Sequence, residues 1–261
     1  MVISHKHKFI FMHSRKCGGS SVEVMLNNFL GPNDIQIGSW YETIKSGGNL
    51  NKKAFVDVFF SPLAVYLSLR QVAGSALRRQ SPNLPLILNS SMKRKYSAQL
   101  GPNPSCPTAA QVSAFDPKAW STYFKFAFVR NPYDFEVSDY FWRTKTQSPP
   151  IGFKEFLRRK LDSQRTDSEK VVPFPVINWP IYTINDTIAV SYVGRFESLA
   201  NEVKTIGHKI GLPLDINAVP RAKNEHRIKT NSADLYDDES KEMVSLLHKK
   251  EIDYFKYTYP F

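Results

Sequence analysis

The stretch Phe9-Ile10-Phe11-Met12-His13-Ser14-Arg15-Lys16-Cys17-Gly18-Gly19-Ser20-Ser21 decides the fold of this 261-residue chain. Its first five residues predict a short buried strand, and the apolar spacing of residues 22–26 predicts a helix after the loop. A strand, a glycine turn and a helix start form a cradle for an anion. The glycines let the backbone approach phosphate oxygens, and the helix start attracts negative charge. The stretch therefore predicts a phosphate-binding loop.

The order of residues in this loop separates it from the loop of nucleotide triphosphatases. That loop reads G-x-x-x-x-G-K-[ST], and the string does not occur in this chain. Here Lys16 precedes the glycines, and Ser20 and Ser21 follow them as candidate N-cap residues of the helix. This order favours a phosphate-bearing donor other than ATP.

The composition indicates a folded, strongly basic protein. Hydrophobic residues make up 42% and aromatic residues 13%, which is enough to fill the core of one domain. The formal net charge is +11, from 35 Lys and Arg against 24 Asp and Glu. Such a charge suits nucleic acid, a polyanionic sugar or a nucleotide, and equally an ordinary solvated surface. The basic runs 93–95 and 158–160 lack interleaved aromatic residues, so we expect no nucleic-acid partner.

The sequence also bears on the compartment. No apolar run approaches the roughly 18 residues needed to span a bilayer, and the N-terminus does not resemble a signal peptide. Cys17 and Cys106 alone cannot form a disulfide scaffold or a metal site, so they fit a reducing compartment. We expect a soluble cytoplasmic protein, or a Golgi lumenal protein only if an anchor was removed. The oligomeric state stays open.

Strands alternate with helices along the chain, which predicts an α/β domain with a mainly parallel central sheet. We expect one or two buried helices within 55–78 and a long irregular stretch over 81–107, which holds five prolines. Dense aromatic and β-branched residues predict a buried strand at 123–129. Further expected elements are helices at 108–115, 133–142, 153–165, 197–210 and 237–255 and a hairpin over 181–190.

A second anion-binding element follows the strand at 123–129. The strand leads into Arg130, which places a guanidinium at the carboxyl edge of the sheet, where open α/β folds bind ligands. The planar fork of Arg suits phosphate. Ser138, about two helical turns further on, can add a hydroxyl donor. The alternative interpretation is that Arg130 forms an ion pair with Asp134 and caps the loop.

Together these elements resemble the sulfotransferases that use 3′-phosphoadenosine 5′-phosphosulfate (PAPS), in particular the carbohydrate branch with its Golgi-type and bacterial members. Residues 14–21 are similar to the family's 5′-phosphosulfate loop, which often reads Pro-Lys-x-Gly-Gly-Thr-Ser. Residues 123–140 resemble the 3′-phosphate motif, and residues 193–213 and 236–257 resemble later landmarks. The resemblance covers most of residues 8–30 and 108–261.

The resemblance implies a P-loop-like three-layer fold over a single domain, residues 1–261, with 31–107 as an acceptor-side insertion or lid. It implies transfer of a sulfuryl group from PAPS to a hydroxyl or amine of a carbohydrate-like acceptor, without a metal ion. Lys16 would be catalytic by steadying the bridging oxygen. The donor would be held by Arg15, Lys16, Cys17, Gly18, Gly19, Ser20, Ser21, Arg130, Ser138 and, from a basic segment near the C-terminus, Arg227.

The general base departs from the family pattern, because no histidine lies between His13 and His208. Relatives often carry histidine close to the position of Cys106, which is a replacement or an ordinary loop residue. Asp57 lies in an apolar segment where burial could raise its pKa, and we predict it as the base, with Glu42 second. The alternative for Asp57 is a satisfied buried carboxylate.

Three other functions stay open on the sequence. A small-molecule kinase would share the phosphate cradle, but the triphosphatase string is missing. A non-catalytic polyanion-binding module would not need paired anion motifs at strand ends. The third alternative is a sulfotransferase-like protein that keeps its donor site and has lost its base.

Overall fold

The computed structural model describes residues 1–60, 62–78, 81, 83–162, 177–218 and 232–261. Contacts between residues divide the chain into two compact units. The first comprises residues 1–14, 18–128 and 180–222, and the second residues 15–17, 129–179 and 223–261, in each case in their described parts. Both units are discontinuous in sequence, so the chain passes repeatedly from one to the other.

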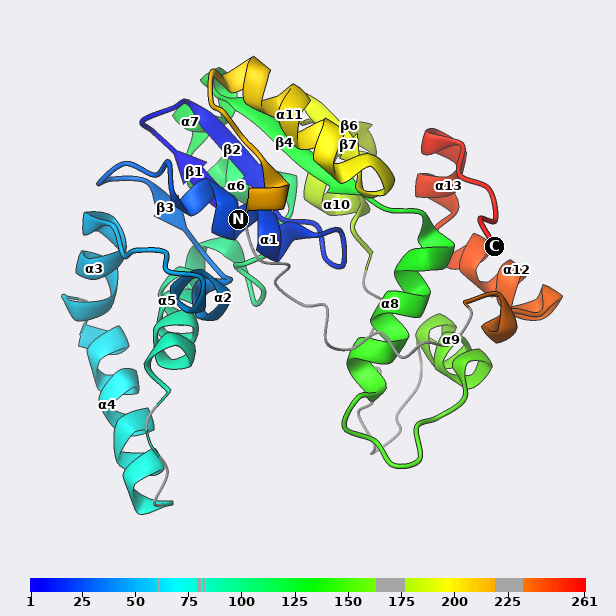
Figure 1. Ribbon diagram of the computed structural model, residues 1–261, viewed down its shortest axis with the longest axis horizontal. Coiled ribbons are helices and arrows are strands. Elements are labelled where there is room, and N and C mark those ends of the chain that lie inside the picture. The colour runs from blue at the N-terminus through cyan, green and yellow to red at the C-terminus, as the bar shows by residue number, and fades with distance from the viewer. Residues whose placement is uncertain (61, 79–80, 82, 163–176, 219–231) are drawn as a thin grey trace. The chain divides into compact units, whose positions relative to one another are not determined.

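The first unit contains a five-stranded sheet with the order β3-β1-β2-β4-β7 (Figure 1). β2 and β4 pair in parallel, with Phe9 opposite Phe124 and Met12 opposite Ala127. The chain therefore leaves both strands at the same edge of the sheet. β1 runs antiparallel to β2 and to β3, neither of which pairings was expected. The strands are β1 Val2–Ser4, β2 Phe9–Met12, β3 Ile35–Gln36, β4 Phe124–Val129 and β7 Tyr192–Arg195.

The mixed α/β class predicted from the sequence is confirmed, and so is the buried nature of its two central strands. β2 is fully buried, and the last four residues of β4 are buried as well. Their phenylalanine rings form the centre of the core: the ring centroids of Phe11 and Phe126 are 5.2 Å apart, and those of Phe9 and Phe126 are 5.9 Å apart. The aromatic density that predicted these strands therefore serves packing.

The first unit also contains helices. They are α1 Gly19–Asn27, α2 Trp40–Lys45, α3 Lys52–Phe59, α4 Pro62–Leu77, α5 Leu84–Leu100, α6 Ala109–Phe115, α7 Pro117–Thr122 and α11 Leu199–Ile210. The 3₁₀ turns η1 Phe196–Ser198 and η2 Ile216–Ala218 flank α11. Gly211 ends α11 in the left-handed conformation, with φ 68°, as the sequence predicted.

The segment 81–107 was predicted wrongly, because α5 occupies most of it and packs beside α4 (Figure 1). Prolines suggested an irregular stretch, but Pro85 lies in the first turn of α5, where a missing N–H costs nothing. The Asn83 side chain caps the helix by accepting from Leu86 N at 3.2 Å. The helices within 55–78 were expected to be buried, yet Phe59, Phe60 and Tyr66 are more than half exposed.

The hairpin predicted over 181–190 is present in shorter form. α10 Trp179–Tyr182 precedes β5 Thr183–Ile184, which pairs antiparallel with β6 Thr187–Ile188. The turn residues Asn185 and Asp186 both have positive φ, the conformation that two-residue hairpin turns require.

The second unit is a cluster of helices with an aromatic core. It contains α8 Pro132–Thr144, α9 Phe153–Leu161, the 3₁₀ turn η4 Ser232–Leu235, α12 Asp238–Leu247 and α13 Lys249–Phe255. Tyr133, Tyr140, Phe153 and Phe156 are buried together between α8, α9 and α12. The single closing helix predicted over 237–255 is divided at His248 into α12 and α13. Among the described residues, no helix is both long and apolar enough to cross a membrane.

Candidate functional site

The predicted strand, glycine turn and helix are confirmed in residues 9–27. Gly18 adopts the left-handed conformation, with φ 74°, and is the N-cap residue of α1. Its carbonyl accepts from Ser21 N at 3.0 Å and Val22 N at 3.2 Å, which closes the first turn. Ser20 and Ser21 were expected to cap the helix, but both lie inside its first turn, and the cap makes no side-chain hydrogen bond. The backbone N–H groups of this turn are the groups that an anion would meet.

His13 and Glu23 meet beneath this turn, and sequence reasoning did not identify them as a pair. His13 Nδ1 lies 2.9 Å from Glu23 Oε1, and the Met1 ammonium also binds Glu23. Burial alone would raise the pKa of Glu23, but the Met1 ammonium and His13 outweigh it and lower the pKa to about 2. The Cδ2–Nε2 edge of His13 lies against Gly19, where a Cβ atom would overlap it. Glu23 therefore stays an anion beside the loop.

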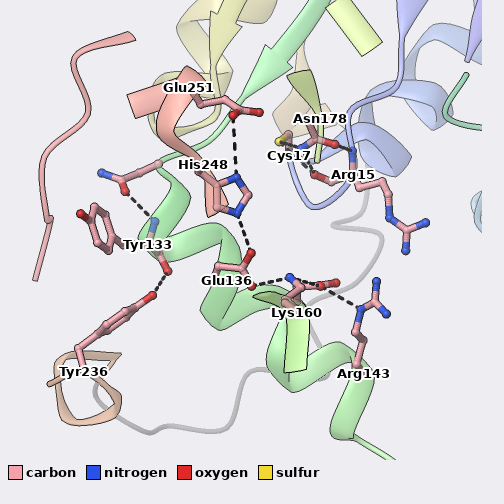
Figure 2. Close-up of polar contacts among 12 residues, drawn as sticks. Arg15, Cys17, Tyr133, Glu136, Arg143, Lys160, Asn178, Tyr236, His248 and Glu251 are labelled. Carbon is pink, nitrogen blue, oxygen red and sulfur yellow. Dashed lines mark hydrogen bonds and ion pairs between the residues drawn. The ribbon is translucent and has the colours of Figure 1, made fainter. Parts of the chain in front are cut away.

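The lysine part of the loop belongs to the second unit, where Asn178 fixes it. Asn178 Oδ1 accepts from Arg15 N at 2.9 Å, and Asn178 Nδ2 donates to the Arg15 carbonyl at 3.0 Å (Figure 2). Cys17 Sγ donates to the same carbonyl at 3.2 Å. Lys16 has φ 58°, a conformation uncommon for a residue with a side chain. A clamp on the preceding residue holds this strained backbone in place.

Arg130 contacts both the loop and the helix that follows it. Its Nη1 donates to the Lys16 carbonyl at 2.8 Å, while its Nε and Nη2 lie 2.8 Å and 2.6 Å from Asp134 Oδ2. The ion pair with Asp134 foreseen as an alternative is therefore present. It coexists with the hydrogen bond from Nη1 to the Lys16 carbonyl.

Ser138, which was predicted to bind the donor, lies on one face of α8. Asp134, Ser138 and Trp142 follow each other at four-residue spacing, so they share this face. Lys16 Nζ lies 5.0 Å from the centre of the Trp142 ring. Lys16 contacts Trp142 and Arg130 contacts Asp134, so these two residues from separate motifs lie at opposite ends of one helix face. The half-buried Ser138 lies between Asp134 and Trp142 along the helix.

A buried charged cluster on the other side of α8 was missed by the sequence analysis. Lys160 is completely buried, with Nζ 2.5 Å from Glu136 Oε2 and 2.9 Å from Asp139 Oδ2. Glu136 also contacts His248 Nε2 at 2.7 Å, and Asp139 pairs with Arg143 at 2.9 Å (Figure 2). Burial raises the pKa of both carboxyls, but Lys160 outweighs it and keeps them below their ordinary values. The cluster joins α8, α9 and the junction of α12 with α13.

Asp57, the predicted base, lies on α3 and is held by three donors. Lys53 Nζ donates to it at 2.7 Å, and Lys95 and Tyr96 of α5 bind the same carboxylate. The expected rise in its pKa is wrong. Burial does raise the pKa, but the hydrogen bonds from Lys53, Lys95 and Tyr96 outweigh it and lower the pKa overall. This is the satisfied carboxylate foreseen as the alternative.

The structure describes the other two candidates for the base, but not the predicted donor-binding residue near the C-terminus. Glu42 is half-buried on α2, and Cys106 is half-buried in the loop before α6. Arg227 lies outside the described residues, as does the basic segment around it. Within the described residues, no group of three or more His, Cys, Asp and Glu side chains could hold a metal ion.

Comparison with known proteins identifies the class. The model of a family described as the sulfotransferase family matches residues 1–258, so the chain belongs to the sulfotransferase family. The resemblance seen in the two anion motifs is therefore confirmed at the level of the family. An uncharacterized protein of Archaeoglobus fulgidus is 27% identical over 116 residues, which cover 42% of this chain and 88% of that protein. No solved structure matches the chain.

Proposed function

We propose that the protein transfers a sulfuryl group from PAPS to a hydroxyl or amine of a carbohydrate-like acceptor. Membership of the sulfotransferase family supports sulfuryl transfer in general. The observation that carries the choice of donor is the 2.8 Å hydrogen bond from Arg130 Nη1 to the Lys16 carbonyl. It joins the residue proposed to bind the 3′-phosphate to the residue proposed to bind the 5′-phosphosulfate. The 3′-phosphate and the 5′-phosphosulfate are the two groups that distinguish PAPS from ATP.

Each half of the donor has its own proposed contacts. The 5′-phosphosulfate would lie on the backbone N–H groups of residues 17–21, beside the side chains of Arg15 and Lys16, because a helix start and two glycines leave these groups open to an anion. The 3′-phosphate would accept from the fork of Arg130 and the hydroxyl of Ser138, and Arg227 would add a further positive charge.

Sulfuryl transfer needs positioning and charge stabilisation more than covalent help. As the acceptor oxygen attacks sulfur in line with the departing phosphate, negative charge grows on the bridging oxygen. The Lys16 ammonium would stabilise this charge. Its contact with the Trp142 ring and the clamp on Arg15 reduce the freedom of its side chain and backbone, so less entropy is lost when the transition state forms.

We place the acceptor on residues 31–107, within one catalytic domain over 1–261. A cavity of about 550 Å³ opens between α4 and α5, lined by Arg70, Arg78 and Asn83. Its two guanidinium groups suit a sugar with carboxylate or sulfate groups. On α3, the rings of Phe55 and Phe59 are half exposed and 4.6 Å apart, which offers a flat apolar surface for the C–H face of a sugar.

The reaction also needs a general base, for which the sequence predicts Asp57. Asp57 stays a prediction, but a carboxylate whose pKa is lowered by three donors is a poor proton acceptor. Replacement by asparagine tests its role. If Asp57 is the base, Asp57→Asn abolishes sulfuryl transfer and leaves nucleotide binding intact.

Calorimetry with 3′-phosphoadenosine 5′-phosphate against ADP tests the donor. We expect the bisphosphate to bind at least about tenfold more tightly, since one charge-assisted phosphate contact contributes about 1.5–3 kcal/mol. Lys16→Ala should weaken binding of the bisphosphate, and Arg130→Ala should selectively remove the preference for the 3′-phosphate.

Two matched variants control for lost charge and lost ion pairs. Lys145→Ala removes another lysine on the Trp142 ring, with Nζ 3.6 Å from its centre. Arg159→Ala breaks another ion pair four residues apart, to Glu155 at 2.7 Å. Both should bind the bisphosphate like the unaltered protein. A preference for ADP, or binding of neither nucleotide, would refute the proposed donor.

A further inference from the structure

His13 occupies a position from which it can take a proton. It is the first residue after β2, at the sheet edge where the chain enters the glycine turn. Its Nδ1 lies 2.9 Å from Glu23 Oε1, and Glu23 is completely buried. A carboxylate beside one ring nitrogen keeps the proton on that nitrogen and leaves the other nitrogen as an acceptor. On the 2.9 Å contact of Nδ1 with Glu23, we assign Nε2 as the proton-accepting nitrogen of His13.

Nε2 lies against the first residue of α1. A Cβ atom at position 19 would overlap Cδ2 and Nε2 of His13 and lie 2.9 Å from Cε1, so only glycine leaves room for the ring. The ring also stacks on Phe11, with centroids 5.9 Å apart and planes at 25°. His13 is thus held beside the N–H groups of residues 18–21, and its side chain keeps 12% of its surface exposed. A group bound on those N–H groups would lie near an oriented imidazole.

Glu23 also lies close to residues 31–107, the segment proposed to bind the acceptor. Its second oxygen, Oε2, is buried without a hydrogen-bond partner in the part of the chain that the structure describes, and so is Ser105 Oγ. Both border Gly38: a Cβ there would lie 3.0 Å from Ser105 Oγ and 3.6 Å from Glu23 Oε2. Buried polar atoms are normally satisfied, so this pair indicates a place for a hydroxyl or a water molecule. Gly38 and Ser105 both belong to residues 31–107.

From this geometry we propose that His13, oriented by Glu23, is the general base of the transfer, and this inference rests on the proposed sulfotransferase function. The acceptor O–H gives its proton to His13 Nε2 as its oxygen forms a bond to sulfur. The bond from sulfur to the phosphate oxygen of the donor breaks, and the electron pair stays on that oxygen. Glu23 does not take the proton; it stabilises the imidazolium as a positioning residue.

The assignment explains why the chain can lack a mid-chain histidine. His13 has a buried anion on one ring nitrogen, whereas Asp57 is held by Lys53, Lys95 and Tyr96. A base must give up its own partners before it accepts a proton, so a carboxylate bound to two ammonium groups is the poorer choice. In the described part of the chain, Glu23 of α1 faces His13, and the Met1 ammonium before β1 binds the same carboxylate.

The test compares His13→Gln with Asp57→Asn. Turnover is followed with ³⁵S-labelled PAPS, as transfer to a panel of mono- and disaccharides and as release of sulfate into water. Binding of 3′-phosphoadenosine 5′-phosphate is measured on the same samples. We expect His13→Gln to lower kcat about 10²- to 10⁴-fold with bisphosphate affinity within about threefold of the unaltered protein. If His13 rather than Asp57 is the base, Asp57→Asn retains turnover.

Two further readouts separate a base from a packing residue. In His13→Ala, added imidazole should restore part of the turnover. In the unaltered protein, kcat should fall as pH drops through the range in which an imidazole takes up a proton, whereas a carboxylate base would sustain it to about pH 4. Glu23→Gln should lower kcat more than it changes KM, because it disturbs the orientation of the ring.

The outcomes distinguish this inference from the proposed function. An unaltered protein that binds no bisphosphate, or that binds it and turns over no PAPS, contradicts the sulfotransferase proposal and the inference with it. Turnover in the unaltered protein together with full turnover in His13→Gln overturns the inference alone. Should His13→Gln not fold, sustained kcat down to about pH 4 in the unaltered protein overturns it equally.

Discussion

The side-chain amide of Asn178 is hydrogen-bonded to both backbone polar groups of Arg15. Oδ1 accepts from the N–H at 2.9 Å, and Nδ2 donates to the carbonyl at 3.0 Å. The amide thus satisfies the N–H and the carbonyl of Arg15, as the backbone of a neighbouring strand would. Asn178 itself is buried, so water cannot replace these two bonds without opening the packing around it.

Replacing Asn178 should therefore impair donor binding without removing any group that touches the donor. Asn178→Ala removes the two hydrogen bonds to Arg15, of about 1 kcal/mol each, so we expect bisphosphate affinity to fall about tenfold or more. Calorimetry measures this change. Asn201→Ala makes the same substitution on the exposed face of α11 and should leave affinity unchanged. Equal affinity in the two variants would show that the loop does not need its clamp.

The buried cluster around Lys160 predicts a large loss of stability on removal of one cation. Lys160→Met leaves Glu136 and Asp139 buried without their shared ammonium, which should cost about 3–5 kcal/mol of unfolding free energy. Lys154 is the matched control on the same helix: it also pairs with two carboxylates, Asp237 and Glu239, but in solvent. Lys154→Met should leave the free energy of unfolding in urea at pH 7 nearly unchanged.

The same cluster predicts the direction of acid sensitivity. The folded pKa values of Glu136 and Asp139 lie below their unfolded values. Their contribution is therefore complete above an unfolded pKa of about 4 and is lost as pH falls through the folded values. Lys160→Met should raise these folded pKa values, so its acid unfolding should begin at higher pH. Identical acid unfolding midpoints would contradict the role assigned to Lys160.

Gly19 should be intolerant of even one methyl group. In Gly19→Ala the Cβ would overlap the ring of His13, which is wedged against Phe11 and Glu23. We expect a loss of about 1–3 kcal/mol in unfolding free energy and weaker bisphosphate binding. Gly74→Ala on α4 is the control, because nothing lies within 4 Å of its Cβ. It should be neutral or stabilise the helix by up to about 1 kcal/mol, which thermal unfolding would reveal.

Asp57→Asn should affect stability rather than chemistry. The substitution removes the charge that accepts from Lys53, Lys95 and Tyr96, so we expect a loss of about 1–3 kcal/mol. Asp238→Asn, which alters a fully exposed pair with Lys241, should leave the free energy of unfolding nearly unchanged. A stable Asp57→Asn protein without turnover would return Asp57 to the role of base.

Local sequence patterns were sufficient to predict the elements whose structure depends on neighbouring residues alone. The aromatic strands at β2 and β4, the glycine turn and the end of α11 at Gly211 all follow from neighbouring residues. β1 and β3 were missed, because strands of three and two residues are too short to show a period. α5 was missed because Pro85 looked like a break and instead starts the helix.

The candidate site was only partly predictable for a different reason. Lys16 and Arg130 were found because each lies in a motif with its own chemistry. Lys160 looked like part of an exposed basic run, since its burial depends on Glu136 and Asp139 of another helix. Contacts such as that of Asn178 with Arg15 join residues far apart in the chain and leave no local pattern.

The clamp of Asn178 on Arg15 also has a consequence for how the protein is made. The two residues are 163 positions apart in sequence. At a synthesis rate of about 5–20 residues per second, roughly 8 to 30 seconds separate the emergence of the loop from that of its clamp. During this interval a nascent chain carries the complete glycine loop without the amide that fixes it. Donor affinity should therefore appear late in translation, after most of the chain has left the ribosome.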